Sequence, residues 1–324
     1  MNKKATKSFP KIILIEPIWG NNTYPYYFGT IKEVFNSGVN FSIIKEKITS
    51  VKDIKKIGLK DEDVIIFGYG WLGSEYFHKI EGIEDLKNLK LCFFHKPFNN
   101  YMKKVKFVRE SNFSLLLSST PKTKKFNKDT NIKTILFPYG CDNRIFGLYP
   151  QKNKKFDIGF SGALHNSIHY KGVEFASQDL RFRAQEKISK YFAGKKFLNG
   201  SDNIWYRIKS TKSYARVLQK SKIWLSTTGP MNDMSSRYFE VAGSSSISLT
   251  NNIPEEYGSI FKDKKNVIVF KNDCSNILDK LANAIEDSKN LKEMALFARN
   301  EVMKNHTYIK RSEELITLIE KLKS

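Results

Sequence analysis

The stretch that decides the fold is Ser235-Ser236-Arg237-Tyr238-Phe239-Glu240-Val241-Ala242-Gly243, which is followed by a strand-like segment at 246–250. Turn-forming residues precede it at 227–233, so a helix is predicted to begin near Ser235 or Ser236 and to end at Gly243. A serine at that position can cap free backbone N–H groups. Because unpaired N–H groups and the helix dipole both favour negative charge, the helix start is a candidate anion site.

Arg237 and Glu240 are three residues apart and therefore share a face of this helix. The arginine could meet a phosphate, and the glutamate could accept hydrogen bonds from a diol. Together they outline a nucleotide-sugar pocket. The alternative is a surface ion pair, which stabilises a helix by only about 0.2–0.5 kcal/mol.

Outward from this stretch, short apolar segments alternate with helical patterns. In the first half, strands are predicted at 11–15, 40–44, 63–67, 89–94, 113–117 and 134–137. In the second half, they are predicted at 156–160, 196–198, 222–226, 246–250 and 266–270. Helical patterns fall at 26–36, 99–110, 180–192, 214–219, 254–261, 275–288 and 291–304, before a last helix. This alternation predicts an α/β fold with two Rossmann-like parallel-sheet domains facing a cleft.

The polar segment 151–155 separates the two periodic regions and is interpreted as a linker. The predicted organisation is a Rossmann-like N-terminal domain at 1–150 and a Rossmann-like C-terminal domain at 151–304. A C-terminal helix at 305–324 could pack back on the N-terminal domain.

Charge points to phosphate-bearing partners. The 324 residues include 55 Lys and Arg against 33 Asp and Glu, a net charge of +22. Nucleotides, nucleic acid and anionic lipid all fit, although a Lys-, Asn- and Ile-rich composition can also reflect base-composition bias. The densest basic region comprises Lys103, Lys104, Lys106, Lys122, Lys124, Lys125 and Lys128. It could rest on anionic lipid headgroups or be a merely solvated face.

The sequence has three isolated cysteines, no signal-peptide pattern and no apolar run approaching ~18 residues. These features predict a cytoplasmic protein whose membrane contact, if any, is peripheral. His165 and His169 are four residues apart, as metal ligands often are. No third ligand follows at a matching spacing, so no metal is expected.

Further candidates lie in loops that follow predicted strands. His95 could act as general base on an acceptor hydroxyl, since imidazole titrates near neutral pH, or it could be structural. Trp19, Gly20, Tyr69 and Trp71 lie in Gly- and aromatic-rich loops of the first half. Their rings suit sugar faces and are assigned to the acceptor side, although turn aromatics also occur without ligands.

In the second half, Gly159 and Gly162 bracket a strand-to-loop turn. Their backbone could approach a phosphate, or they could form an ordinary tight turn. Arg183, with Arg181 and Lys187 nearby, opens a predicted helix. It could reach a diphosphate or lie on a solvated basic face.

From Tyr214 onward the sequence resembles the C-terminal nucleotide-sugar domain of GT-B glycosyltransferases of the "glycosyl transferases group 1" type. The segment 235–243 carries most of this resemblance. Other matching segments are Thr250-Asn251, 253–257, 266–270 and His306-Thr307-Tyr308 with Arg311. The segment 157–162 extends the match to the start of the second domain, and 138–142 with Phe146 looks like the interdomain segment. The first half matches only in architecture, as expected of a variable acceptor-side domain.

The resemblance implies roles for individual residues. Glu240 matches the glutamate that binds the donor ribose hydroxyls, and Ser235, Ser236 and Arg237 would face the diphosphate. The other donor-side residues are Gly162, His165 and Arg183, with Lys171 as a rival cation to Arg183.

Enzymes of this kind generally need no bound metal or other cofactor, because cationic side chains and a helix terminus stabilise the leaving diphosphate. One position departs from the family. Many retaining members have a glutamate eight residues before the ribose glutamate, where this chain has Asn232, with Asp233 beside it. Neither retaining nor inverting stereochemistry is therefore assigned.

The sequence predicts a cytoplasmic, metal-independent glycosyltransferase, at most peripheral to the inner face of the membrane. It would move a sugar from a nucleotide diphosphate sugar, of the UDP or GDP type, to a hydroxyl of a glycan or glycolipid in cell-surface glycan synthesis. No nucleic-acid partner is expected. The alternatives are a non-catalytic nucleotide- or glycan-binding protein of the same fold and a basic nucleic-acid-binding protein.

Overall fold

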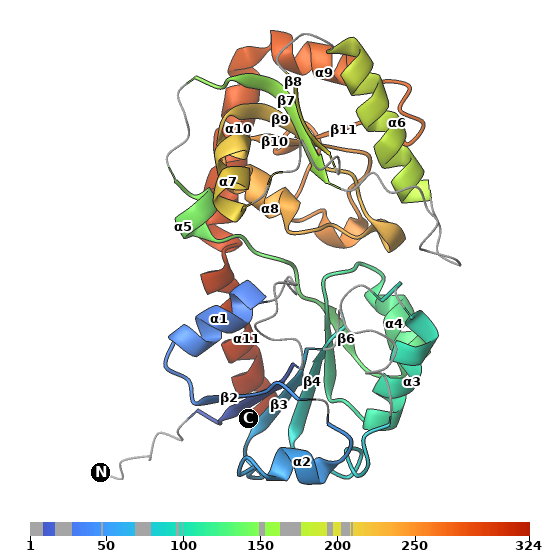
Figure 1. The fold of residues 1–324 in the computed structure, drawn as a ribbon, viewed down its shortest axis with the longest axis vertical. Coiled ribbons are helices and arrows are strands. Elements are labelled where there is room, and N and C mark those ends of the chain that lie inside the picture. The colour runs from blue at the N-terminus through green and yellow to red at the C-terminus, as the bar shows by residue number, and fades with distance from the viewer. Residues whose placement is uncertain are drawn as a thin grey trace. The chain divides into compact units, whose positions relative to one another are not determined.

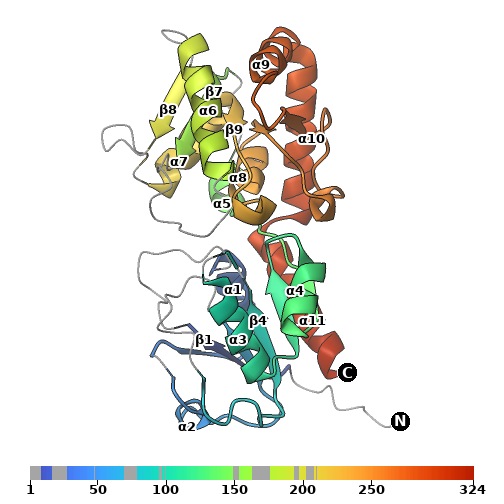
Figure 2. The same ribbon diagram turned by 90° about the vertical axis from the view of Figure 1, so that its right-hand side faces the viewer.

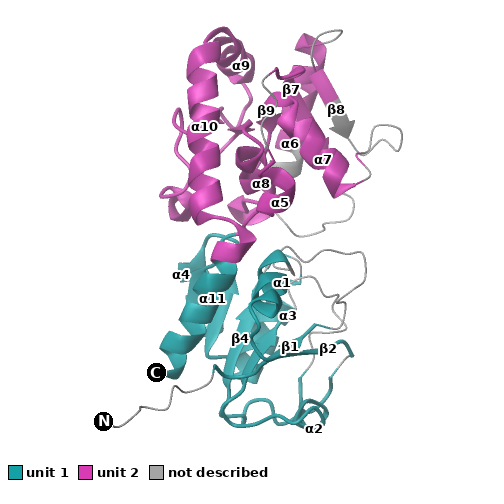
Figure 3. Cartoon of the chain, turned by 90° about the vertical axis from the view of Figure 1, so that its left-hand side faces the viewer, with its two compact units in different colours: residues 1–138, 311–324 teal, residues 139–310 magenta. Residues whose placement is uncertain are grey.

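The computed structural model describes residues 9–16, 28–46, 48–68, 79–94, 97–98, 100–148, 153–162, 176–192, 197–201, 208 and 210–324. The chain forms two compact units, residues 1–138 with 311–324 and residues 139–310 (Figure 3). Each unit is a parallel sheet with helices packed on it (Figure 1). The predicted class, two α/β parallel-sheet domains, is confirmed.

The first unit contains a six-stranded sheet in the order β2-β1-β3-β4-β5-β6. Its strands are β1 (Ile12–Ile15), β2 (Phe41–Ile44), β3 (Val64–Phe67), β4 (Leu89–Phe93), β5 (Leu115–Ser118) and β6 (Thr134–Leu136). Its helices are α1 (Phe28–Asn36), α2 (Val51–Lys55), α3 (Tyr101–Ser111), α4 (Thr123–Thr130) and most of α11 (Tyr308–Lys323). Strands β1, β3 and β5 are buried along their whole length, which explains their continuous apolar sequences.

The last helix of the chain completes the core of the first unit. One face of the sheet, including Ile12 and Leu14, packs in one cluster with Ile31 of α1 and with Leu315 and Ile319 of α11. Both α11 side chains are fully buried. The first unit therefore needs residues from both ends of the sequence.

The second unit contains a five-stranded sheet in the order β11-β10-β9-β7-β8. Its strands are β7 (Phe156–Gly162), β8 (Phe197–Ser201), β9 (Ser221–Leu225), β10 (Ile247–Thr250) and β11 (Val267–Val269). Its helices are α5 (Asn143–Phe146), α6 (Ala176–Tyr191), α7 (Thr211–Gln219), α8 (Arg237–Gly243), α9 (Ile277–Glu286) and α10 (Ser288–Asn305). Helix α8 packs against α10 (Figure 2). Two short 3₁₀ turns, η3 (Pro230–Asn232) and η4 (Glu255–Tyr257), lie between strands.

In both sheets the chain proceeds in two directions from a central pair of strands. In the first sheet, β2 lies on one side of the central pair β1 and β3, and β4 to β6 follow on the other side. In the second sheet, β8 lies on one side of the central pair β7 and β9, and β10 and β11 follow on the other side. Such a reversal marks where ligands bind in open α/β sheets, beyond the carboxyl ends of the strands. The expected sites therefore follow β1 and β3 in the first unit and β7 and β9 in the second.

The second unit begins at Tyr139, before the linker predicted at 151–155, and it extends to Lys310 instead of 304. The earlier start has a physical cause, because the segment after Pro138 is bonded to the rest of the unit. The Cys141 N–H donates to the His306 carbonyl at 3.1 Å, and the Tyr308 N–H donates to the Cys141 carbonyl at 3.0 Å.

Arg299 of α10 adds a second link between distant parts of this unit. Its Nη2 donates to the Gly147 carbonyl at 2.5 Å and its Nη1 donates to the Gly243 carbonyl, at the end of α8, at 2.6 Å. The segment after β6 is thus attached to the C-terminal end of α8 through one guanidinium.

Replacing Leu315 by alanine should destabilise the first unit by about 2–5 kcal/mol, because a fully buried leucine is removed from its core. Leu322→Ala on the same helix is the control, since that side chain is 42% exposed. Hydrogen exchange of backbone amides would be measured. In Leu315→Ala, exchange should accelerate in β1 and β3 but not in β9 and β10. In Leu322→Ala, exchange should not accelerate in any of these strands. Equal protection of β1 and β3 in the two variants would contradict this role of α11.

Candidate functional site

Helix α8 begins beyond the carboxyl end of β9, at the reversal point of the second sheet. The Ser235 carbonyl accepts from the Tyr238 N–H at 3.3 Å, and the Ser236 carbonyl accepts from the N–H groups of Phe239 and Glu240, both at 3.0 Å. The expected serine cap is not seen. Ser236 has helical φ and ψ of −52° and −25°, and its side chain makes no capping bond. Its hydroxyl is bonded to the Glu240 carboxyl instead.

Tyr238 fixes the position of α8 against the sheet. Its side chain is buried, and its hydroxyl bonds to the Ser226 carbonyl just after β9 and to the Thr250 hydroxyl at the end of β10, the latter at 2.7 Å. The Tyr238 hydroxyl thus joins the first turn of α8 to the ends of β9 and β10. The orientation of Arg237 and Glu240 follows from this anchor, because they flank Tyr238 on the same short helix.

Arg237 reaches back to the end of β7, the strand that neighbours β9. A Cβ on Gly162 would lie 3.1 Å from the Arg237 Nη2 and 3.5 Å from its Nη1. Gly162 also has a φ of +134°, a conformation that side chains strongly disfavour. The backbone therefore favours glycine at this position, and the guanidinium lies directly over the end of β7.

Glu240 is half-buried, and burial raises the pKa of its carboxyl to about 7. The hydrogen bond from Ser236 and the positive charge of Arg237 oppose this shift, in that order of size. A carboxyl held away from water beside a guanidinium is the kind of group found at functional sites. Its ionised form has two oxygens that can accept from neighbouring hydroxyls.

Tyr214 of α7 is a neighbour of Arg237 that the sequence did not suggest. Burial raises the pKa of its phenol, while nearby Arg237 and Ser161 lower it. Its ring makes edge contacts with Trp224 at 5.9 Å and with Phe146 at 6.1 Å between centroids. Tyr214 thus connects β7, β9 and α5 to the Arg237 side chain. A lone tyrosine on an amphipathic helix carries no sequence signal for such a role.

On α6, the structure brings Arg181 to the loop after β9. The Arg181 Nε donates to the Thr227 hydroxyl at 3.0 Å. The helix begins at Ala176, so Arg183 is not at its start as expected but in its second turn. Residues two apart on a helix face different directions, so Arg183 does not share the helix face of Arg181. Lys187 donates to the Cys274 carbonyl at 3.0 Å.

The loop between β9 and α8 has a defined and strained conformation. The Thr228 N–H donates to the Asn251 Oδ1 at 2.9 Å, which attaches the loop to the end of β10. Met231 and Asn232 both have left-handed backbone conformations, with φ of 59° and 61°. Two consecutive non-glycine residues of this kind are uncommon, and such strain is found at ligand-binding loops. The side chain of Asn232 is exposed.

Six predicted site residues lie outside the described residues: Trp19, Gly20, Tyr69, Trp71, His95 and His165. In sequence, the four acceptor-side residues follow β1 and β3, the central strand pair of the first sheet. Glu16, directly after β1, is fully buried, and its N–H donates to the Ile44 carbonyl at 2.9 Å. A buried carboxylate at a reversal point is a functional candidate that the sequence analysis missed, although its place after a four-residue apolar strand was visible there.

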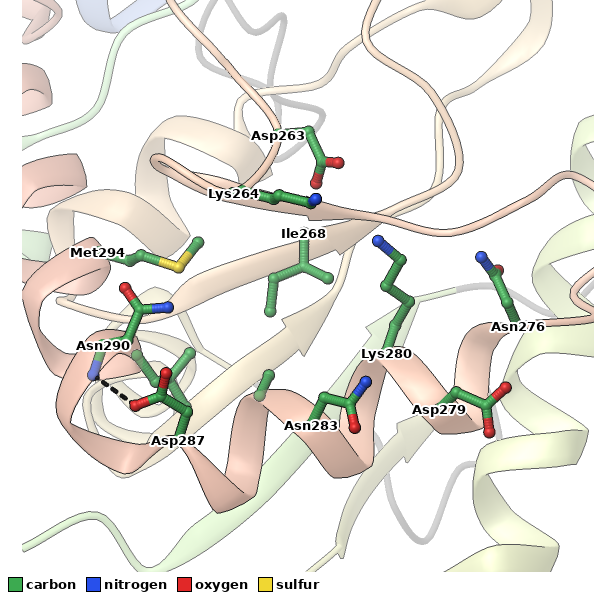
Figure 4. A pocket seen from close by; sticks show the side chains of 12 residues that line it. Asp263, Lys264, Ile268, Asn276, Asp279, Lys280, Asn283, Asp287, Asn290 and Met294 are labelled. Carbon is green, nitrogen blue, oxygen red and sulfur yellow. Dashed lines mark hydrogen bonds between the residues drawn. The ribbon is translucent and has the colours of Figure 1, made fainter.

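A groove of 480 Å³ lies elsewhere in the second unit, between β11 with its preceding loop and helices α9 and α10 (Figure 4). Ile268, Leu291 and Met294 are its buried residues. Two of its carboxylates accept hydrogen bonds from backbone N–H groups. Asp263 accepts from the Val269 N–H at 2.8 Å, and Asp287 accepts from the Asn290 N–H at 3.1 Å. None of the predicted site residues lines this groove.

Within the described ranges, no three His, Cys, Asp or Glu side chains gather where they could hold a metal ion. The metal independence of the protein stays a prediction, since His165 is outside those ranges. In the same ranges no helix combines the length and the apolar character needed to cross a bilayer.

One family of known proteins matches part of the chain that contains α8. Residues 183–317, which include α8, match the family described as "Glycosyl transferase-like". No curated protein matches the chain.

Solved structures that align with most of the chain share its fold at low sequence identity. HepE of Anabaena, solved in complex with UDP and glucose, aligns over 96% of this chain and 99% of its own, with 9% identity and a TM-score of 0.62. A sucrose-phosphate synthase of Thermosynechococcus elongatus aligns over 97% and 99%, with 10% identity and a TM-score of 0.65. TarM aligns over 83% of this chain and 57% of its own, with 13% identity and a TM-score of 0.59. The chain has the GT-B fold, and its resemblance to glycosyltransferases of that fold is confirmed.

Proposed function

We propose that this protein is a glycosyltransferase that moves a sugar from a nucleotide diphosphate sugar to a hydroxyl of a glycan or glycolipid. The observation that carries the proposal is the position of Arg237 and Glu240 on α8, at the reversal point of the second sheet. Arg237 is aimed at the end of β7, where a diphosphate would approach the Gly162 backbone. Glu240, one turn further along α8, offers two oxygens to a ribose diol.

Each group has a defined part in the proposed reaction. Bond breaking leaves negative charge on the departing diphosphate, and a preorganised guanidinium stabilises that charge without metal. Arg181, which is bonded to Thr227 in the loop after β9, would supply a second cation. On the acceptor side, a base after β1, β3 or β4 would remove the hydroxyl proton, and His95 and Glu16 are the candidates there.

Structural neighbours supply the first donor to test. HepE was solved with UDP and with glucose, so a UDP-sugar is the first choice for this chain. The proposed location is the cytoplasm, with any contact with the inner face of the membrane peripheral, and the proposed role is in surface polysaccharide or glycolipid synthesis. Three buried free cysteines, Cys92, Cys141 and Cys274, are consistent with a reducing compartment.

A thermal-shift screen with UDP, GDP and their sugars, followed by a nucleotide-release assay, tests the proposal. One nucleotide diphosphate should stabilise the protein by about 2.7 kcal/mol at a hundredfold excess over Kd. Release of that nucleotide from its sugar should persist in EDTA. Nucleotide binding without release or transfer to any acceptor would favour the non-catalytic binding protein. Stabilisation by polynucleotide alone would contradict the proposal outright.

A further inference from the structure

Helices α3 and α4 pack side by side on the first sheet and form one rigid surface (Figures 1 and 2). Tyr101 of α3 joins them, because its hydroxyl donates to Asp129 of α4 and its ring lies 6.2 Å from that of Phe126. Lys125 completes the junction, with its Nζ 2.5 Å from Asp129 and 4.9 Å from the centre of the Tyr101 ring. The relative position of the two helices is therefore fixed within the first unit.

This surface, here called the α3–α4 basic face, carries a dense excess of exposed positive charge. Its exposed cations are Lys103, Lys106, Arg109, Lys122, Lys124, Lys125 and Lys128. The two helices contain only two acidic residues. Glu110 is 3.8 Å from Lys106 and Asp129 is 2.5 Å from Lys125. Lys104, which the sequence analysis grouped with these lysines, is buried and is not part of the face.

An apolar side chain stands among these cations. Met102 is 72% exposed, the highest value for a large hydrophobic residue in the described part of the chain. Lys106 and Arg109 follow at i+4 and i+7, so they share the helix face of Met102. An exposed flexible apolar group surrounded by cations is the pattern of a surface that enters the boundary between headgroups and acyl chains.

We propose that the α3–α4 basic face docks on an anionic lipid bilayer, with its lysines on headgroup phosphates and Met102 inserted at the acyl boundary. This goes beyond the transfer reaction and does not require it. Lipid is favoured over nucleic acid because six of the seven cations are lysines, which act as point charges on phosphate. Of the two aromatic rings at the helix junction, Phe126 is buried and Tyr101 is engaged with Lys125 and Phe126, whereas single-strand binding relies on open aromatic rings for stacking.

Vesicle flotation with the full chain tests this proposal. The variant Lys103→Gln/Lys124→Gln/Lys128→Gln neutralises three exposed cations of the face that have no ion pair with Glu110 or Asp129. The matched control is Lys289→Gln/Lys292→Gln/Lys304→Gln, which removes the same charge from exposed positions of α10. Vesicles of phosphatidylcholine, with and without phosphatidylglycerol, serve as the probe.

The wild type and the α10 control should bind phosphatidylglycerol vesicles alike, and neither should bind pure phosphatidylcholine. The α3–α4 variant should bind about 100-fold more weakly, because each lysine near an anionic surface contributes about 1 kcal/mol. Met102→Ser should weaken binding further in moderate salt, where screening reduces the electrostatic part.

Equal loss in both triple variants would overturn the proposal, since net charge alone would then explain binding. Tighter binding of RNA than of vesicles in the same buffer would also overturn it. Nucleotide release without acceptor is measured in parallel, so failure of docking is distinguished from failure of the proposed reaction.

Discussion

Replacing Glu240 by glutamine should weaken nucleotide binding by about 10- to 100-fold, because a hydrogen bond to a charged group contributes about 1.5–3 kcal/mol. Glutamine keeps the size of the side chain but offers one acceptor oxygen and no charge. Titration calorimetry with UDP would measure the change. Glu286→Gln, an exposed position on α9, is the control and should bind like the wild type. Unchanged UDP affinity in Glu240→Gln would remove the assignment of Glu240 to the ribose.

The same substitution should make the second unit more stable above pH 7. Burial raises the pKa of Glu240 from 4.5 to about 7, so the folded protein holds this proton more tightly than the unfolded chain does. The contribution of this group to stability is therefore fully present below pH 4.5 and is lost as pH rises towards 7. Glutamine avoids the buried charge, and a gain of about 1–2 kcal/mol at pH 8 is expected after allowance for its partial exposure.

Combining the two measurements separates a binding role from a structural one. In the wild type, UDP affinity should fall as pH drops below 7, because the ionised carboxylate is the better acceptor. In Glu240→Gln, affinity should be low at both pH 6 and pH 8. A variant that loses both stability and binding at pH 8 would indicate that Glu240 holds α8 together instead of binding a donor.

Replacing Gly159 by alanine should destabilise the second unit by about 3 kcal/mol or more. The added Cβ would lie 2.2 and 2.5 Å from two ring carbons of Trp224. That indole is fully buried and packed edge-on to Tyr214, so it has no room to move aside. Gly159 is inside β7 and makes room for a tryptophan of the adjacent strand β9. Its role is thus packing, whereas a phosphate approach or a tight turn was expected from the sequence.

Gly229→Ala is the control for this substitution, because its φ is −83° and its nearest new contact is 3.5 Å away. Urea unfolding should show little change for it. In the double variant Gly159→Ala/Trp224→Leu, the smaller side chain should relieve the clash, so the cost of Gly159→Ala should shrink when Trp224 is absent. Strictly additive free energies of unfolding would refute a direct clash.

The strands were the most predictable part of the fold. All eleven described strands overlap segments predicted from short apolar runs. The signal is clearest for β1, β3 and β5, which are buried along their whole length and are therefore almost continuously hydrophobic. The short helices α2, α4 and α5 were missed. Helix α4 buries only Phe126 and Thr130 and has no apolar stripe to detect. The helix expected at 254–261 is only the 3₁₀ turn η4, which begins after Pro254 and ends at Gly258.

The site was predictable only where it is local in sequence. Spacing alone put Arg237 and Glu240 on one helix face. The contact of Arg237 with Gly162 and the bond from Arg181 to Thr227 depend on how β7, β9 and α6 pack, which no spacing encodes. The serine cap was expected from residue preference. It fails because Ser236 already adopts a helical conformation and its hydroxyl bonds to Glu240.

The contribution of α11 to the first unit has a consequence for biosynthesis. Leu315 and Ile319 follow the whole of the second unit in the sequence, yet they pack with Ile12 and Leu14, which precede it. Domains generally fold in the order in which they are synthesised. Here the first sheet cannot complete its core until α11 has been synthesised, and by then all of the second unit has been made. Until then part of one apolar face stays uncovered, and exposed hydrophobic surface on a nascent chain is an aggregation hazard.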